Sequence, residues 1–104
     1  MAGQNGATAG TLDPLIHESS RLVIVSVLHE GQWMEFNFLL SATGLTKGNL
    51  STHIARLIAA GYVEEWKEFV DRKPRTSYQL TASGRKAFRQ YRKTWHRLTG
   101  GQVG

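Results

Sequence analysis

The chain has 104 residues, of which 40% are hydrophobic and 20% charged, as expected for one globular domain with a modest core. It contains no cysteine, which excludes disulfides, thiolate chemistry and cysteine-based metal sites. The net charge is +5, and residues 71–104 hold nine of the thirteen Lys and Arg against one acid. Such a lopsided positive field is expected of a protein that meets a polyanion, although a solvated charged helix would produce the same bias.

The composition also bears on location and on the chain ends. The longest apolar run, residues 22–25, is too short to cross a bilayer, and no secretory leader is recognisable. We therefore expect no membrane association and a cytoplasmic location. Residues 1–11 are small and polar, which predicts a disordered tail, and residues 99–104 predict a flexible C-terminal tail. One domain is predicted between them, over residues 12–98.

The first predicted element is a helix. Asp13 suits a helix N-cap and Pro14 suits the first helical position. The helix is predicted to run from there to about His29. A short strand over residues 32–34 is predicted to follow.

Two further helices are predicted close together. Residues 35–43 form the second helix, and Gly44 after it suits a left-handed helix end. Thr46 is a good N-cap for a third helix over residues 47–60. Two short helices joined by a tight turn that contains glycine are typical of a helix-turn-helix.

The rest of the chain predicts a hairpin and a last helix. Residues 62–70 and 76–80 predict two strands joined by a turn at residues 71–75. Thr81 caps a final helix over residues 82–98. The element order is α-β-α-α-β-β-α, a mostly helical α+β fold of the winged helix-turn-helix type.

The third helix has the pattern of a recognition helix, which lies in the DNA major groove. Leu50, Ile54 and Leu57 recur at helical spacing and form its buried face. Small and polar side chains on the outer side would permit close approach to bases. An ordinary amphipathic helix with a polar outer side would show the same pattern. The predicted contacts within residues 47–60 are Lys47, Gly48, Asn49, Ser51, Thr52, His53 and Arg56.

The hairpin turn is strongly basic. Arg72, Lys73 and Arg75 put three positive charges on it, and Pro74 stiffens it by fixing φ. Such a tip can lie along a phosphate backbone or enter a narrow minor groove. Basic turns also occur for solubility, but one that directly follows a helix-turn-helix is more specific. We predict a DNA-binding wing over about residues 70–76, with contacts from Arg72, Lys73, Arg75 and Thr76.

These segments resemble a known superfamily. Residues 44–54 with Leu57, and then residues 61–63, resemble the recognition helix and the start of the wing in MarR-like and ArsR-like regulators. Residues 72–76 and 78–85 resemble the wing and the start of the final helix. The resemblance covers residues 12–98. It implies a winged-helix fold, a dimer and a repressor or activator role. It also implies that DNA is contacted by Lys47, Asn49, Ser51, Thr52, His53, Arg56, Arg72, Lys73 and Arg75.

The chain departs from this superfamily in two respects. It lacks the long extra helices that many MarR-like proteins use for dimerisation and ligand binding, and it lacks the cysteine ligands of ArsR-like metal sensors. Both absences count against the usual ligand sensing. A cleft between the first and last helices, lined by Trp33, Tyr91 or Trp95, would suit an apolar effector, but tryptophan at such places is more often core. A small-molecule effector therefore has no firm support in the sequence.

The final helix carries a large aromatic stripe. Phe88, Tyr91, Trp95 and Leu98 recur at helical spacing, and part of this stripe must pack on the domain's own core. Four bulky residues exceed what one small core needs. We therefore predict that part of the stripe packs against the first helix of a second subunit in a homodimer that reads a palindromic site. The predicted interface residues are Leu15, Leu22, Phe88, Tyr91, Trp95 and Leu98.

Catalysis and metal binding need convergent side chains, which the sequence does not supply. No pair among His17, His29, His53 and His96 has the spacing of a helical metal site. We predict no catalytic residues, no metal and no cofactor. The predicted function is a sequence-specific regulator that binds double-stranded DNA. The alternative, from another class, is a winged helix that serves only as a protein-interaction module.

Overall fold

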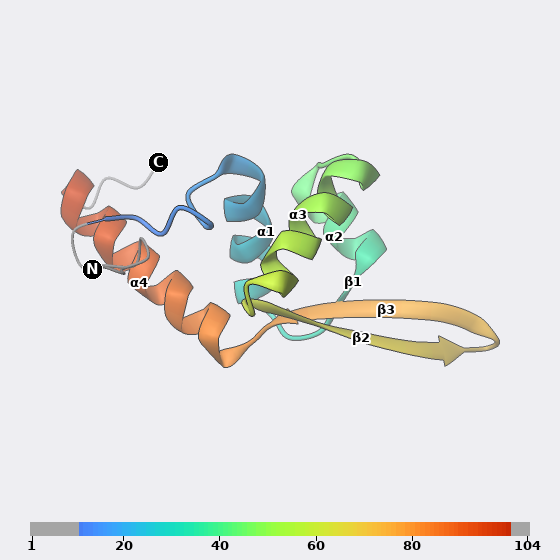
Figure 1. The fold of residues 1–104 in the computed structure, drawn as a ribbon. Coiled ribbons are helices and arrows are strands. Elements are labelled where there is room, and N and C mark those ends of the chain that lie inside the picture. The colour runs from blue at the N-terminus through green and yellow to red at the C-terminus, as the bar shows by residue number, and fades with distance from the viewer. Residues whose placement is uncertain (1–10, 101–104) are drawn as a thin grey trace.

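The computed structural model describes residues 11–100, and the predicted element order is confirmed (Figure 1). The first half contains the helices that build the body of the domain: α1 (Ser19–His29), α2 (Phe36–Thr43) and α3 (Lys47–Ala59). A short strand, β1 (Met34–Glu35), precedes α2. The second half contains the hairpin β2 (Val63–Val70) and β3 (Lys73–Leu80), followed by α4 (Ala82–Thr99). This is a winged helix-turn-helix.

The core lies where α1, α2 and α3 meet the inner end of the sheet. These helices, β2, β3 and α4 contribute aliphatic or aromatic side chains that are almost fully buried, and these contacts supply the main stabilisation of so small a domain. The buried face predicted for α3 is confirmed, because Leu50, Ile54 and Leu57 are all at most 2% exposed. The other buried core residues are Ile16, Ile24, Val25, Leu28, Leu39, Val63, Tyr78, Leu80, Phe88 and Tyr91.

The turn between α2 and α3 follows the local sequence. Gly44 ends α2 in the left-handed region at φ 72°, and its N–H donates to the carbonyl of Leu40. The Thr46 hydroxyl accepts a 3.1 Å hydrogen bond from the backbone N–H of Asn49, so Thr46 is the N-cap of α3. The orientation of α3 relative to α2 is therefore set largely by Gly44, which ends α2, and Thr46, which begins α3.

The sheet is antiparallel, with strand order β1-β3-β2. β1 pairs with only Ser77 and Tyr78 of β3, whereas β2 pairs with β3 along its whole length from Val63 to Val70. The far half of the hairpin therefore has no third strand beside it, and the start of α2, at Glu35, Phe36 and Asn37, faces it across an open hollow. It projects well beyond the helices, as Figure 1 shows.

The predicted turn over residues 71–75 is wrong in length. Val70 pairs directly with Lys73, so the turn consists of Asp71 and Arg72 alone, at φ 53° and 67°. Two consecutive left-handed residues match the type of two-residue turn that suits the twist of a hairpin. Pro74 consequently lies inside β3, opposite Phe69, and does not stiffen the turn itself.

The predicted start of the first helix is also wrong. α1 begins at Ser19, and its N-cap is Glu18, whose side chain accepts a 2.8 Å hydrogen bond from the Arg21 N–H. Asp13 instead stabilises a separate turn by accepting a 2.9 Å bond from the Leu15 N–H. The extended backbone of Glu18, at φ −152°, separates this turn from the helix.

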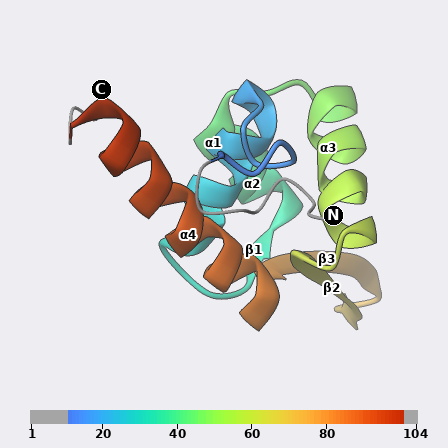
Figure 2. The same cartoon turned by 60° about the vertical axis from the view of Figure 1, so that its left-hand side comes forward.

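The last helix runs past α1 with its C-terminal half farthest from the hairpin (Figures 1 and 2). Thr81 caps it by accepting from the Gly84 N–H at 2.9 Å, and Gly100 ends it at φ 69°, slightly beyond the predicted end at residue 98. No helix among residues 11–100 is long and apolar enough to cross a membrane. The predicted tails lie outside the described residues, except for Thr11, Thr99 and Gly100.

Candidate nucleic-acid interface

The outer face of α3 is open to solvent and carries small and polar side chains between the longer Lys47 and Arg56. The buried face of the helix fixes its rotation, so the opposite side looks away from the core. Gly48 also lies on this side of the helix, and a Cβ added there would meet nothing within 4 Å. The predicted contact residues on this exposed face are Lys47, Gly48, Asn49, Ser51, Thr52 and Arg56.

His53, also predicted as a contact, lies differently. Its side chain is 19% exposed, and its Nδ1 lies 3.1 Å from Nη1 of Arg21 and 3.8 Å from Oε1 of Glu18. Arg21 is in turn anchored by a 2.6 Å bond from its Nε to the carbonyl of Leu15. His53 therefore ties α3 to the start of α1, on the flank of the helix and apart from its most exposed residues.

The tip of the hairpin is cationic and fully accessible. Arg72, Lys73 and Arg75 are all exposed, and Thr76 is half-buried. The Arg75 Nε lies 3.6 Å from Oε2 of Glu35, the residue before α2. Because both side chains are about half exposed, water screens this ion pair, and Arg75 retains freedom to exchange Glu35 for another anion.

The connection between α3 and β2 fixes the hairpin relative to the helix. Gly61 has φ 80°, a conformation that glycine adopts without strain, and it turns the chain from α3 into β2. The Gly61 carbonyl accepts a 2.6 Å bond from the Thr81 hydroxyl at the start of α4. The base of the hairpin is thus tied to both helices, and the hairpin runs below α3 and α2 and projects beyond them (Figure 1).

The residues predicted at a dimer interface are unevenly buried. Phe88 and Tyr91 are only 6% and 4% exposed, so they belong mainly to the domain's own core. Leu15 and Leu22 are partly buried against that core. Trp95 is half-buried and stacks on Tyr91 with centroids 6.5 Å apart, whereas Leu98 is 54% exposed.

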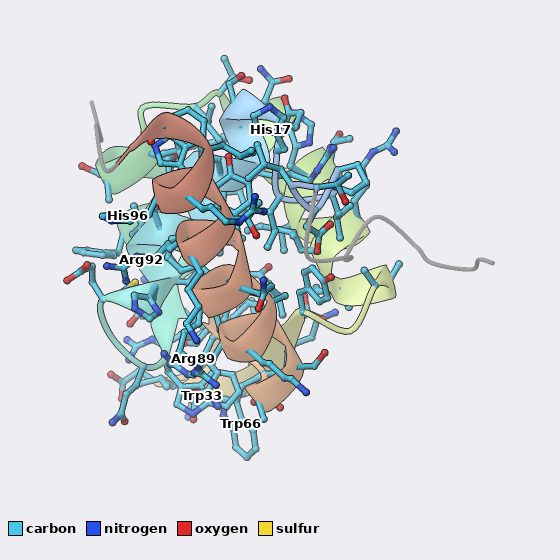
Figure 3. The ribbon with its side chains drawn as sticks, turned by 90° about the vertical axis from the view of Figure 1, so that its left-hand side faces the viewer. His17, Trp33, Trp66, Arg89, Arg92 and His96 are labelled. Atoms are coloured by element: carbon cyan, nitrogen blue, oxygen red, sulfur yellow. The ribbon has the colours of Figure 1, made fainter. Side chains whose placement is uncertain are left out.

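An open groove runs between α1 and α4, with a volume of about 710 Å³. Its floor is apolar and its rim is cationic. Figure 3 shows the rim residues Arg89, Arg92 and His96 along α4. The groove is lined by Leu22, Ser26, Phe88, Arg89, Tyr91, Arg92, Lys93, Trp95 and His96. The predicted cleft is therefore present, but Trp33 does not line it.

Trp33 packs instead with Trp66, with ring centroids 6.2 Å apart, near the N-terminal end of α4 (Figure 3). The β-sheet register brings these two side chains together across β3, which sequence periodicity could not reveal. The sequence also gave no sign of two residues that position the interface: Arg21, which contacts His53, and Glu35, which contacts Arg75. Within the described part of the chain, no cluster of His, Asp or Glu could hold a metal ion.

The fold and the exposed face define a class, the winged helix-turn-helix DNA-binding domains. The chain belongs to the winged helix DNA-binding domain family, whose model matches residues 20–99. This family agrees with the winged-helix fold and the DNA-binding class predicted from the sequence.

Similar proteins agree with this assignment. The chain is 35% identical to an uncharacterised protein of Methanocaldococcus jannaschii, over 68% of this chain and 77% of that protein. The solved structure of a transcriptional regulator homologue from Pyrococcus horikoshii is 27% identical and has a TM-score of 0.79, over 85% of this chain and 87% of the other. MarR from E. coli, at 18% identity and a TM-score of 0.68, shares the fold over 88% of this chain and 70% of its own.

Proposed function

We propose that the chain is a sequence-specific regulator that binds double-stranded DNA as a homodimer on a palindromic site. The main support is the placement of the exposed face of α3 beside a protruding cationic hairpin, with both fixed to one core. In this arrangement α3, over about residues 47–60, enters the major groove. The wing, over about residues 70–76, contacts the backbone or the minor groove.

The residues on α3 divide into base readers and backbone contacts. Asn49 has the amide that pairs with an adenine edge, and Arg56 can reach guanine or a phosphate. Ser51 and Thr52 reach bases or phosphates, and Gly48 allows close approach. Lys47, at the start of the helix, supplies positive charge toward the backbone. His53, held by Arg21, contributes through the orientation of α3 and through contacts at its flank.

The wing residues act mainly through charge. Arg72, Lys73 and Arg75 neutralise phosphates or line a narrow minor groove, and Thr76 adds a hydroxyl at the edge of the contact. Their contribution is sequence-independent, so they set affinity more than preference.

The homodimer would use the groove between α1 and α4. The exposed Leu98 and the half-buried Trp95 are the parts of the aromatic stripe that the domain's own core leaves accessible. Burying them against a second subunit would remove apolar surface from water. The remaining predicted interface residues, Leu15, Leu22, Phe88 and Tyr91, line or support the same region.

The oligomeric state is tested by light scattering on the wild type and on Leu98→Glu. We expect a dimeric mass for the wild type and a monomeric mass for the variant. Phe38→Glu is the matched control, because Phe38 on α2 is 55% exposed and should not alter the mass. A wild-type protein that is monomeric at micromolar concentration would overturn the dimer.

DNA recognition is tested by measuring affinity for the DNA upstream of the protein's own gene and for a scrambled duplex, across a salt series. A dimer that contacts about six phosphates should give a slope of log K against log salt near about −5. A preference of about 1,000-fold or more for the upstream DNA would establish specific binding.

Variants separate the two kinds of contact. Arg72→Ala should weaken binding to both duplexes, whereas Asn49→Ala should mainly erode the preference. Equal binding to both duplexes would favour a non-specific binder, or a site elsewhere in the genome. No binding at low salt would overturn the DNA proposal and favour the alternative, a winged-helix protein-interaction module.

A further inference from the structure

Phe69, near the tip of the wing, is unusually exposed for its size. It is 76% accessible, more than any other large apolar side chain among residues 11–100. It lies one residue pair before the turn, and neither the core nor the groove along α4 uses it. A ring this exposed near the tip of the hairpin needs a reason other than folding.

Phe69 has an apolar neighbour directly across the hairpin. Its β-sheet partner is Pro74, so the two side chains lie on the same face. Val70 and Lys73 close the two-residue turn, which makes Phe69 and Pro74 a non-hydrogen-bonded pair, the kind with the closer side chains. The missing N–H of Pro74 costs no sheet bond, because it would point away from β2, beyond the part of β3 that β1 covers.

The face that carries this pair is the face that looks toward the helices. Side chains alternate along a strand, so Phe69 shares its face with Val63, and Pro74 shares its face with Tyr78 and Leu80. Those three residues are buried against the helices at the inner end of the hairpin. Farther out, Pro74 and Thr76 lie across an open hollow from Glu35, Phe36 and Asn37 at the start of α2, and the Phe69 ring is left exposed. DNA that lies on α3 and follows the wing would approach this face.

Charge identifies the partner that this apolar pair fits. Arg72 lies in the turn, and the exposed Lys73 and Arg75 extend from the opposite face of β3, so cations flank the pair at the tip of the wing. Asp71 is the one acid within residues 70–76. A protein partner or a core would not need three cations around an apolar wedge. A polyanion with stackable bases matches both features.

We propose that Phe69 and Pro74 form an apolar wedge that enters the minor groove and partly unstacks one base step, bending the duplex. This inference rests on the proposed function. Apolar side chains that enter between base steps kink DNA toward the major groove, and flexible pyrimidine–purine steps open most easily. The wing would therefore favour DNA sequences with an easily unstacked base step at this position, although it makes no hydrogen bond to a base edge there.

The test first selects, from a random pool, the duplex that the protein binds with the highest affinity. The fluorescent base 2-aminopurine is then placed at each position under the wing in turn. Unstacking raises the fluorescence of this base. The wild type should give a rise at one step, and end-labelled duplexes should show bending by energy transfer. Phe69→Ala should abolish the rise and the bend and weaken binding about tenfold, as expected for one base–aromatic stack.

Two controls make the test specific. Trp66→Ala removes an aromatic ring that is 55% exposed on the opposite face of β2, and should change neither signal. Replacing the step under the wing by a rigid A-tract should lower wild-type affinity and leave that of Phe69→Ala almost unchanged. Circular dichroism of Phe69→Ala should match the wild type, because the side chain is outside the core.

The outcomes are separable from those for the proposed function. Specific binding by the wild type without unstacking, or unstacking that Phe69→Ala retains, would overturn the wedge and leave the regulator intact. If the wild type selects no duplex from the pool, the proposed function fails, and the wedge fails with it.

Discussion

The Tyr62 hydroxyl, at the junction of α3 and β2, donates a hydrogen bond to Oδ2 of Asp13, 49 residues earlier in the chain. This bond holds the segment before α1 against the base of the wing. The neighbouring His17 makes a second tie, since its Nδ1 lies 2.8 Å from the Tyr91 hydroxyl on α4. The N-terminal segment thus links the junction of α3 and β2 to the last helix.

The first prediction concerns stability at high pH. Burial raises the pKa of Tyr62, and the hydrogen bond to Asp13 and the negative charge of Asp13 raise it further. A raised pKa means that the folded state holds the proton more tightly, so this stability is present below pH 10 and is lost as pH rises above it. Tyr62→Phe should therefore flatten the alkaline loss of stability and cost about 1 kcal/mol at neutral pH. Urea unfolding at a series of pH values measures the free energy of unfolding at neutral pH and its decrease at alkaline pH. The same decrease in Tyr62→Phe as in the wild type would contradict the prediction.

The second prediction contrasts two glycines. A Cβ at Gly84, in the first turn of α4, would lie 2.1 Å from the carbonyl oxygen of Tyr62, which is backbone and cannot move aside. Gly84→Ala should cost about 2 kcal/mol or more in thermal unfolding. At Gly48 a Cβ meets nothing, so Gly48→Ala should stabilise α3 by about 0.5–1 kcal/mol and weaken DNA binding by obstructing the groove. Equal stability of the two variants would count against the close approach of α4 to the Tyr62 carbonyl at Gly84.

The third prediction concerns the ion pair at the wing. The Nε of Arg75 lies 3.6 Å from the carboxylate of Glu35, so in the proposed complex Glu35 would compete with phosphate for Arg75. Glu35→Gln should raise DNA affinity about two- to fivefold at low salt, and the gain should shrink as salt is added. Glu64→Gln is the matched control for charge, because Glu64 contacts Gln79 and not a wing cation. The prediction fails if both variants change affinity by the same factor.

The fourth prediction concerns the start of α1. The backbone N–H of Arg21 lowers the pKa of Glu18 below 4.5, with smaller help from the Ser20 N–H and the charges of His53 and Arg21. A lowered pKa means that the carboxylate stabilises the fold above pH 4.5, and that this is lost as pH falls through the folded value. Glu18→Ala should cost about 1 kcal/mol at neutral pH and less in acid. Thermal melts from neutral to acid pH test this, with the exposed Glu68→Ala as the comparison.

Much of α3 and of the turn before it was predictable because the residues that specify them are close together in the sequence. Gly44, Thr46 and the spacing of Leu50, Ile54 and Leu57 act within a few residues, and each has the predicted role. The start of α1 was not predictable in this way. Asp13 has the chemistry of an N-cap, but its carboxylate is used by Leu15 and by the distant Tyr62.

The sequence by itself determined the winged-helix order, the exposed polar face of α3 and the basic character of the wing, because helix periodicity, end signals and charge are properties of neighbouring residues. Only the tertiary structure decided that His53 turns toward Arg21, that Arg75 lies beside Glu35 and that Phe69 opposes Pro74. Each of these depends on packing or strand register between separate elements. A one-residue change in register would exchange the two faces of the hairpin, and no local pattern specifies that choice.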